Sequence, residues 1–91
     1  MSVDPRSLPR LAKKARLRFD RHSGGYMIVY PERGLALNES AAEIAKRLDG
    51  TRTIAEIARE IARAAAGSPE EVERDVARFV DALADKGLLE P

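Results

Sequence analysis

Few side chains in this 91-residue chain are of the types that perform covalent chemistry. The chain has no cysteine, which excludes a disulfide framework, a thiolate metal site and a cysteine nucleophile. Its single histidine, His22, stands in a glycine-rich stretch with no second metal-binding residue at ligand spacing. We therefore expect His22 to be an exposed turn residue rather than a metal ligand.

Neighbouring carboxylates are the other candidates, because two acids can divide general acid and general base work between them. Glu70 with Glu71, and Glu73 with Asp75, stand at the start of an expected helix, where the helix macrodipole favours negative charge. The glycine pair at residues 24–25 fits no phosphate-binding pattern. The sequence therefore predicts a protein that is not an enzyme, with no catalytic residue, no cofactor and no metal.

Length and composition indicate one small domain with one modest core. Apolar residues make up 44% and charged residues 34% of the chain, which is typical of a globular protein. There is neither an apolar run of about 18 residues nor a signal-peptide core, so we expect a cytoplasmic protein without a membrane partner. Pro5 and Pro9 predict an extended arm over residues 1–13, followed by a single domain over residues 14–91.

Charge is unevenly distributed along the chain. Residues 1–21 carry a net charge of +5 and residues 22–91 a net charge of −4. The basic part could attract an acidic partner or a nucleic acid. A solvated arm and a solvated strand face would explain the same charges, and runs of charge are usually of this kind.

Strict alternation of apolar and charged residues begins at Ala15 and predicts a half-buried strand. In this strand Ala15, Leu17 and Phe19 would lie on one face, and the charged residues between them would lie on the other. A second strand is expected at residues 26–30, after a glycine turn. Because this second strand is apolar on both faces, it suits the middle position of three.

The third expected strand is short, residues 35–37, and follows a turn at residues 31–34. No further strand is expected after it, so it should lie at an edge of the sheet with one unpaired row of N–H and C=O groups. Such a row is a template for another extended chain.

Three helices are expected to follow. The first is predicted at residues 39–48, with Asn38 or Ser40 as its N-cap, because Ser40 and Glu43 have the spacing of a capping box. Its end is predicted at the aspartate and glycine of positions 49 and 50.

The second and third helices also have readable ends. Thr53 and Glu56 form a capping-box pattern at the start of the second helix, which ends before residue 67. The third helix opens with Ser68 as N-cap and proline at its first position, and Gly87 with the next leucine predicts a Schellman end. Three strands followed by three helices define an α+β domain.

A helix-turn-helix after a three-stranded sheet invites comparison with winged-helix DNA-binding proteins. The expected third helix, residues 69–86, carries six acidic and three basic side chains, a balance of −3. Because phosphate neutralisation dominates DNA affinity, DNA would repel this helix. The other class, a peptide-binding module that uses the edge strand, stays open on the residues alone, since every open sheet has edges.

The run YPERGLALNESAAEI over residues 30–44 closely resembles the PqqD proteins of pyrroloquinoline quinone biosynthesis. Shorter matching pieces extend the similarity over nearly the whole chain, at residues 8–11, 17–20, 49–50, 53–57, 75–76 and 86–89. The resemblance implies a winged helix-turn-helix fold of three strands and three helices. It also implies a peptide chaperone, the recognition element that binds the precursor peptide PqqA and presents it to the radical S-adenosylmethionine enzyme PqqE.

In this family the leader peptide adds as a strand beside the third strand, in a groove against the third helix. For this chain the resemblance implies backbone pairing at the third strand, a groove wall on the third helix, and two arginines that could meet acidic peptide residues. The implied residues are Leu35, Ala36, Leu37, Asn38, Val72, Arg74, Asp75, Val76, Arg78 and Phe79. Two alternatives stay open: Val76 and Phe79 could simply be core residues, and the arginines could be solvated. No nucleic-acid partner is expected, and either a monomer or a strand-exchanged dimer would fit an open edge.

Overall fold

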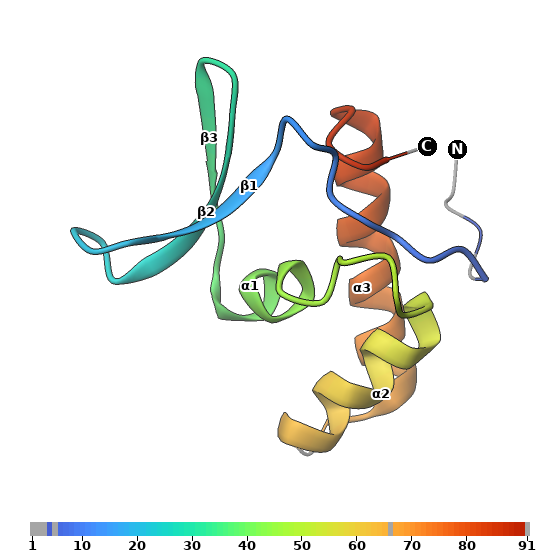
Figure 1. Ribbon diagram of the computed structural model, residues 1–91. Helices are drawn as coiled ribbons and strands as arrows, with labels where there is room; N and C mark the ends of the chain where they lie inside the picture. Colours follow the sequence, from blue (N-terminus) through green and yellow to red (C-terminus); the bar gives the residue numbers. More distant parts are fainter. Residues whose placement is uncertain (1–3, 5, 66, 91) are drawn as a thin grey trace.

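The computed structural model describes residues 4, 6–65 and 67–90 of the chain. Three antiparallel strands in the order β1-β2-β3 precede three helices (Figure 1): β1 (Arg16–Asp20), β2 (Gly25–Tyr30), β3 (Arg33–Ala36), α1 (Glu39–Ala45), α2 (Ile54–Ala65) and α3 (Pro69–Asp85). The expected α+β class is thereby confirmed. Within the described residues, no helix has the length and apolar character needed to cross a membrane.

The sheet packs against the helices with one face only. On this face Ile28 of β2 is fully buried, and its cross-strand partners Leu17 and Leu35 are partly buried beside it. The opposite face carries Met27 and Val29, which stay partly exposed. The apolar character of both faces of β2 therefore reflects its middle position and not burial on both sides.

Phe19 lies on the same face of β1 as Leu17, as the alternation predicts, but it is not buried in the core. Phe19 is 54% exposed, whereas Ala15, at the start of the same alternation, is buried. The β1–β2 hairpin extends beyond the helices (Figure 1), so its far end has no core to enter. Phe19 packs edge-on against Tyr26 instead, with ring centroids 5.2 Å apart.

The turn between β2 and β3 is shorter than predicted. Tyr30 and Arg33 are partners across the hairpin, so only Pro31 and Glu32 lie in the loop. Proline holds its own φ at about −65°, and Glu32 has a φ of 63°. This combination of φ angles is that of a type II turn, whose second central residue is usually glycine or asparagine.

Gly34 was expected in that turn but lies inside β3, which spans Arg33–Ala36 rather than residues 35–37. Glycine at this position leaves space for a neighbouring side chain. A Cβ at position 34 would lie 2.6 Å from the terminal methyl of Met27, so the methionine side chain occupies the space on the outer face. A side chain at position 34 would displace it.

Helix α1 begins after one of the two predicted N-cap residues and is shorter than predicted. Asn38 is the N-cap, since its Oδ1 accepts a hydrogen bond from Ala41 N–H at 2.8 Å. The capping box predicted at Ser40 is wrong, because Ser40 lies inside the helix. Helix α1 ends at Ala45 and not at residue 48, because the amides of residues 47 and 48 donate to carbonyls only three residues back.

The predicted start of α2 is confirmed. Glu56 N–H donates to Thr53 Oγ1 at 3.2 Å, and Thr53 N–H donates to Glu56 Oε1 at 2.8 Å. Both bonds of a capping box are thus formed, each satisfying an amide that has no partner within the helix.

The ends of α3 also follow the sequence. Ser68 is at the N-cap position, although its hydroxyl donates to the Glu70 carboxylate at 2.9 Å and caps no backbone amide. At the other end Gly87 has a φ of 71°, and Leu88 N–H donates to Leu83 O at 2.9 Å. The predicted Schellman end is therefore confirmed.

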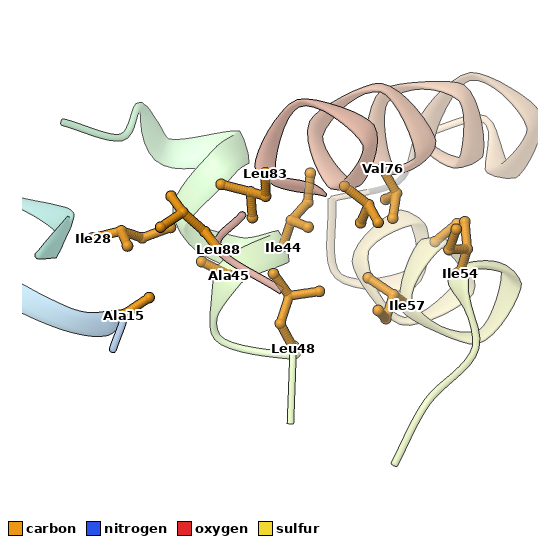
Figure 2. Packing of buried hydrophobic residues seen from close by; sticks show 12 residues of the cluster. Ala15, Ile28, Ile44, Ala45, Leu48, Ile54, Ile57, Val76, Leu83 and Leu88 are labelled. Carbon is orange, nitrogen blue, oxygen red and sulfur yellow. The ribbon is translucent and has the colours of Figure 1, made fainter. Parts of the chain in front are cut away.

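The core runs from the inner face of the sheet to α2 (Figure 2). Its fully buried larger side chains are Ile28, Ile57, Val76, Val80, Leu83 and Leu88. The described part of the N-terminal arm closes one side of this core, because Leu11 N–H donates to Leu48 O at 3.1 Å and Ala12 N–H donates to Leu88 O at 2.8 Å.

Candidate functional site

The open edge of β3 has a defined orientation. Leu37 N–H donates to Tyr26 O at 3.0 Å, so these two opposite residues form a hydrogen-bonded pair. Hydrogen-bonded and non-hydrogen-bonded pairs alternate along an antiparallel ladder. The backbone groups of Leu35 and Leu37 therefore face β2, and those of Gly34 and Ala36 face outward.

The outward residues leave the edge accessible. Gly34 and Ala36 are both exposed and have the smallest side chains, so nothing bulky stands beside their N–H and C=O groups. Asn38 continues the alternation, but its C=O already accepts from Ala42 N–H at 2.9 Å. The open row thus consists mainly of the two N–H and two C=O groups of Gly34 and Ala36.

A groove of about 480 Å³ begins where β3 ends. One wall comes from the start of α1 and the other from α3. The lining residues are Asn38, Ser40, Ala41, Ile44, Asp75, Arg78, Phe79 and Ala82. Because Asn38 lines the groove and stands only two residues after the end of β3, a strand paired with β3 can continue into it.

The groove offers an apolar surface with charges at its rim. Phe79 is partly buried and packs against the core. Asp75 and Arg78 are 65% and 78% exposed, and Arg78 Nη2 lies 4.0 Å from Asp75 Oδ1. An exposed pair at this distance is held weakly, so Arg78 can exchange Asp75 for a carboxylate of a bound molecule.

The structure brings together about half of the residues implied at the sequence level. Asn38, Asp75, Arg78 and Phe79 line one groove, and Ala36 opens its backbone beside it. The other two strand residues, at positions 35 and 37, turn their backbone groups toward β2 and pack their side chains on the core.

Three residues of α3 lie away from the groove. Val76 is fully buried, so the alternative that it is a core residue is confirmed. Val72 packs toward the link before α3, with its Cγ2 3.6 Å from the position of a Cβ on Gly67. Arg74 is exposed and adds to the positive potential at Glu70, one turn earlier. A peptide contact by any of the three stays a prediction.

Sequence reasoning missed Gly34 on the edge and four groove residues. On α1 the missed residues Ala41 and Ile44 are three positions apart, and on α3 Ala82 is three positions after Phe79. Residues at this spacing share a helix face. Helical periodicity therefore identifies these groove residues once α1 and α3 are known to lie side by side.

A chain of ion pairs fixes the α1 wall of the groove against α2. Arg47 Nη1 lies 3.0 Å from Glu43 Oε1, and Arg47 Nε lies 3.2 Å from Glu60 Oε1. Arg52 Nε lies 2.7 Å from the other oxygen of Glu60. Hydrogen bonds from Lys46 and then from Arg47 hold the pKa of Glu43 below its usual value.

The site as a whole combines backbone donors and acceptors, an apolar wall and one exchangeable ion pair. No three His, Cys, Asp or Glu residues come together to hold a metal ion in the part of the chain that the structure describes. Main-chain pairing beside an apolar groove is the arrangement that holds an extended peptide.

Comparisons with known proteins agree in pointing to one family. A family model described as coenzyme PQQ synthesis protein D (PqqD) matches residues 25–89. The PqqA binding protein of Rhodopseudomonas palustris strain TIE-1 is 40% identical over 98% of this chain and 87% of its own length.

Two solved structures have the same fold. One is the PqqD truncation of Methylobacterium extorquens PqqCD, a functional, stand-alone recognition element for ribosomally synthesized and post-translationally modified peptides. It matches with a TM-score of 0.80 and 32% identity, over 91% of this chain and 88% of that chain. The crystal structure of PqqD from Xanthomonas campestris matches with a TM-score of 0.64 and 32% identity, over 99% and 100% of the two chains.

Proposed function

The chain belongs to the PqqD family, and we propose that it binds the precursor peptide PqqA by strand addition to β3 and presents it to the radical S-adenosylmethionine enzyme PqqE. Relatives named PqqA binding proteins support the choice of peptide. The Methylobacterium recognition element supports the same role at the level of the domain.

One observation carries the proposed binding mode: the outward backbone groups of Gly34 and Ala36 lead directly into the groove beside α3. A peptide strand on this edge gains main-chain hydrogen bonds that demand little of its sequence. Its alternate side chains then reach the apolar wall at Phe79, and an acidic one meets Arg78. Specificity comes from these side-chain contacts and affinity mainly from the backbone.

The proposed role is that of a carrier without catalysis of its own. Holding the peptide raises its effective concentration at PqqE and fixes its orientation. The element order and the short link between α2 and α3 support the winged helix-turn-helix assignment. Residues 4 and 6–13 serve as an arm to the domain; the rest of the predicted arm lies outside the described residues. The acidic surface of α3 argues against the alternative, a nucleic-acid partner.

Calorimetric titration with PqqA, in the absence and presence of PqqE, tests this proposal. Because a flexible peptide must be ordered on binding, we expect a dissociation constant on the order of micromolar. A second assay follows the mass of PqqA: PqqE should convert it faster with the chain present, and the chain alone should leave it unchanged. Absence of PqqA binding, or conversion of PqqA by the chain alone, would contradict the proposal.

A further inference from the structure

The sheet has a second open edge, at β1, whose orientation follows from the same hydrogen bond. Tyr26 turns its backbone groups toward β3, so its neighbour Met27 turns toward β1. Met27 is paired with Arg18, whose backbone groups therefore face β2. The N–H and C=O groups of Leu17 and Phe19, on either side of Arg18, point away from the sheet.

The side chains along this edge are of two kinds. Arg16 and Arg18 extend from the outer face and are exposed, and within the described residues neither forms an ion pair with a carboxylate. On the inner face Leu17 is partly buried and Phe19 is 54% exposed. These four residues line an open hollow of about 510 Å³.

We propose that the β1 edge is a second docking edge, which takes an extended segment of a partner protein in which acidic and apolar side chains alternate. Cross-strand neighbours share a face of a sheet. Carboxylates of the added strand then stand opposite Arg16 and Arg18, and its apolar side chains stand opposite Leu17 and Phe19. The inference does not depend on what occupies β3.

Other occupants fit this edge less well. Pairing of two copies over the whole of β1 places Arg18 opposite its own counterpart, and like charges directly opposite each other are destabilising. A nucleic acid could pair with the arginines, but its backbone has no N–H donors to match the C=O groups of Leu17 and Phe19. A protein strand satisfies both the charges and the backbone.

If both edges are occupied, the protein forms the middle of a five-stranded sheet. The partner strand would lie beside β1 and the other added strand beside β3, on opposite sides of β2 (Figure 1). Two ligands could then be bound at the same time without competing for backbone groups.

A synthetic ten-residue peptide of alternating glutamate and valine is the probe, and a lysine–valine peptide of the same length is its control. Amide hydrogen exchange of the full chain should slow at Leu17 and Phe19 when the glutamate peptide is added. Arg18→Glu should weaken binding at least tenfold. Arg63→Glu, the same charge change at an exposed site on α2, should leave binding unchanged.

Two variants of Phe19 separate the contribution of the backbone N–H from that of the side chain. Phe19→Ala removes only the ring, whereas Phe19→Pro also removes the outward N–H, so the proline variant should bind the probe more weakly than the alanine variant. Circular dichroism verifies that both are folded.

Three results would overturn the proposal: equal binding of the lysine peptide, unchanged binding by Arg18→Glu, or protection of Gly34 and Ala36 in place of Leu17 and Phe19. A dimer of the protein alone that protects Leu17 and Phe19 would assign the edge to a second copy and overturn it as well. PqqA binding by the Arg18→Glu variant is measured separately. This measurement tests the function proposed for β3, so failure of one proposal can be told apart from failure of the other.

Discussion

Replacement of Ala36 by proline removes one backbone N–H that points away from the sheet. Ala36 is exposed, and its backbone makes no bond to β2, so the sheet loses nothing when this donor is removed. Proline is tolerated on an edge strand when the missing N–H faces outward. We therefore expect Ala36→Pro to fold like the parent protein.

The expected effect on PqqA affinity can be worked out from the single lost donor. A peptide strand on β3 would accept one hydrogen bond from Ala36 N–H, and losing such a bond costs about 1–2 kcal/mol. This corresponds to a dissociation constant larger by a factor of about 5–30. Ala36→Ser keeps the N–H and should bind within about twofold of the parent, because surface substitutions change free energies by about 0.5 kcal/mol or less.

Leu37→Pro is the matched change at a residue whose backbone groups face β2. It removes the N–H that donates to Tyr26 O at 3.0 Å and leaves that carbonyl unpaired, at a cost of about 1–3 kcal/mol in the free energy of unfolding. The partly buried leucine side chain is lost as well, and Leu37→Ala measures that part. We expect the proline variant to be less stable than the alanine variant.

Thermal unfolding followed by circular dichroism and calorimetry with PqqA give the two readouts. A folded Ala36→Pro protein that binds PqqA as tightly as the parent would refute strand addition at β3. If Leu37→Pro were as stable as Ala36→Pro, the orientation derived for the edge would itself be wrong.

Four further predictions concern the groove, the turn, a helix cap and the partner. Arg78→Glu should weaken PqqA binding several-fold in calorimetry, because it reverses the charge at the groove rim. The same charge change at the exposed Arg63 on α2 should have no effect. Equal effects of the two variants would show that Arg78 is not part of the site. Glu32→Gly should raise the free energy of urea unfolding by about 0.5–1 kcal/mol, since glycine adopts the positive φ of this position without strain, and a loss of stability would contradict the type II assignment. Hydrogen bonds from the backbone of Thr53 and then from its side chain lower the pKa of Glu56. The contribution of these bonds to folding stability is therefore complete above the unfolded value of 4.5 and is lost as the pH falls through the folded pKa. Between about pH 6 and about pH 3, the midpoint of urea unfolding should fall less steeply in Glu56→Gln than in the parent. Duplex DNA should show no mobility shift at low micromolar protein near about 150 mM salt, because α3 is acidic, and a salt-dependent shift would revive the nucleic-acid alternative.

Local features of this chain could be predicted from its sequence, because their causes lie within a few residues. The capping box of Thr53 and Glu56 and the Schellman end at Gly87 need only groups that lie a few residues apart in the chain. The order of the strands follows in the same way from short connections. Exposure of Phe19 could not be predicted, because alternation gives the face of a strand but not how far the helices extend beneath it.

Which residues of β3 turn their backbone groups outward depends on the length of the turn before it. In a two-residue hairpin loop the closing residues, Tyr30 and Arg33, form a hydrogen-bonded pair, which makes Gly34 and Ala36 outward. Glutamate at a positive φ is unusual, so the sequence favoured a longer turn that included Gly34. The expected turn at residues 31–34 therefore did not identify the closing pair, and without that pair the outward residues of β3 could not be derived from the sequence. The groove required in addition the packing of α1 beside α3, which no local pattern contains.

Amide hydrogen exchange of Gly34 and Ala36, measured with and without PqqA, tests strand addition most directly. In the free protein both amides face solvent and should exchange fast, while Leu37 N–H, bonded to Tyr26 O, should exchange slowly. With PqqA bound, exchange at Gly34 and Ala36 should slow, and the rates at Leu17 and Phe19 on the opposite edge should stay unchanged. If PqqA binds while Gly34 and Ala36 exchange as fast as before, the peptide is not held as a strand on β3.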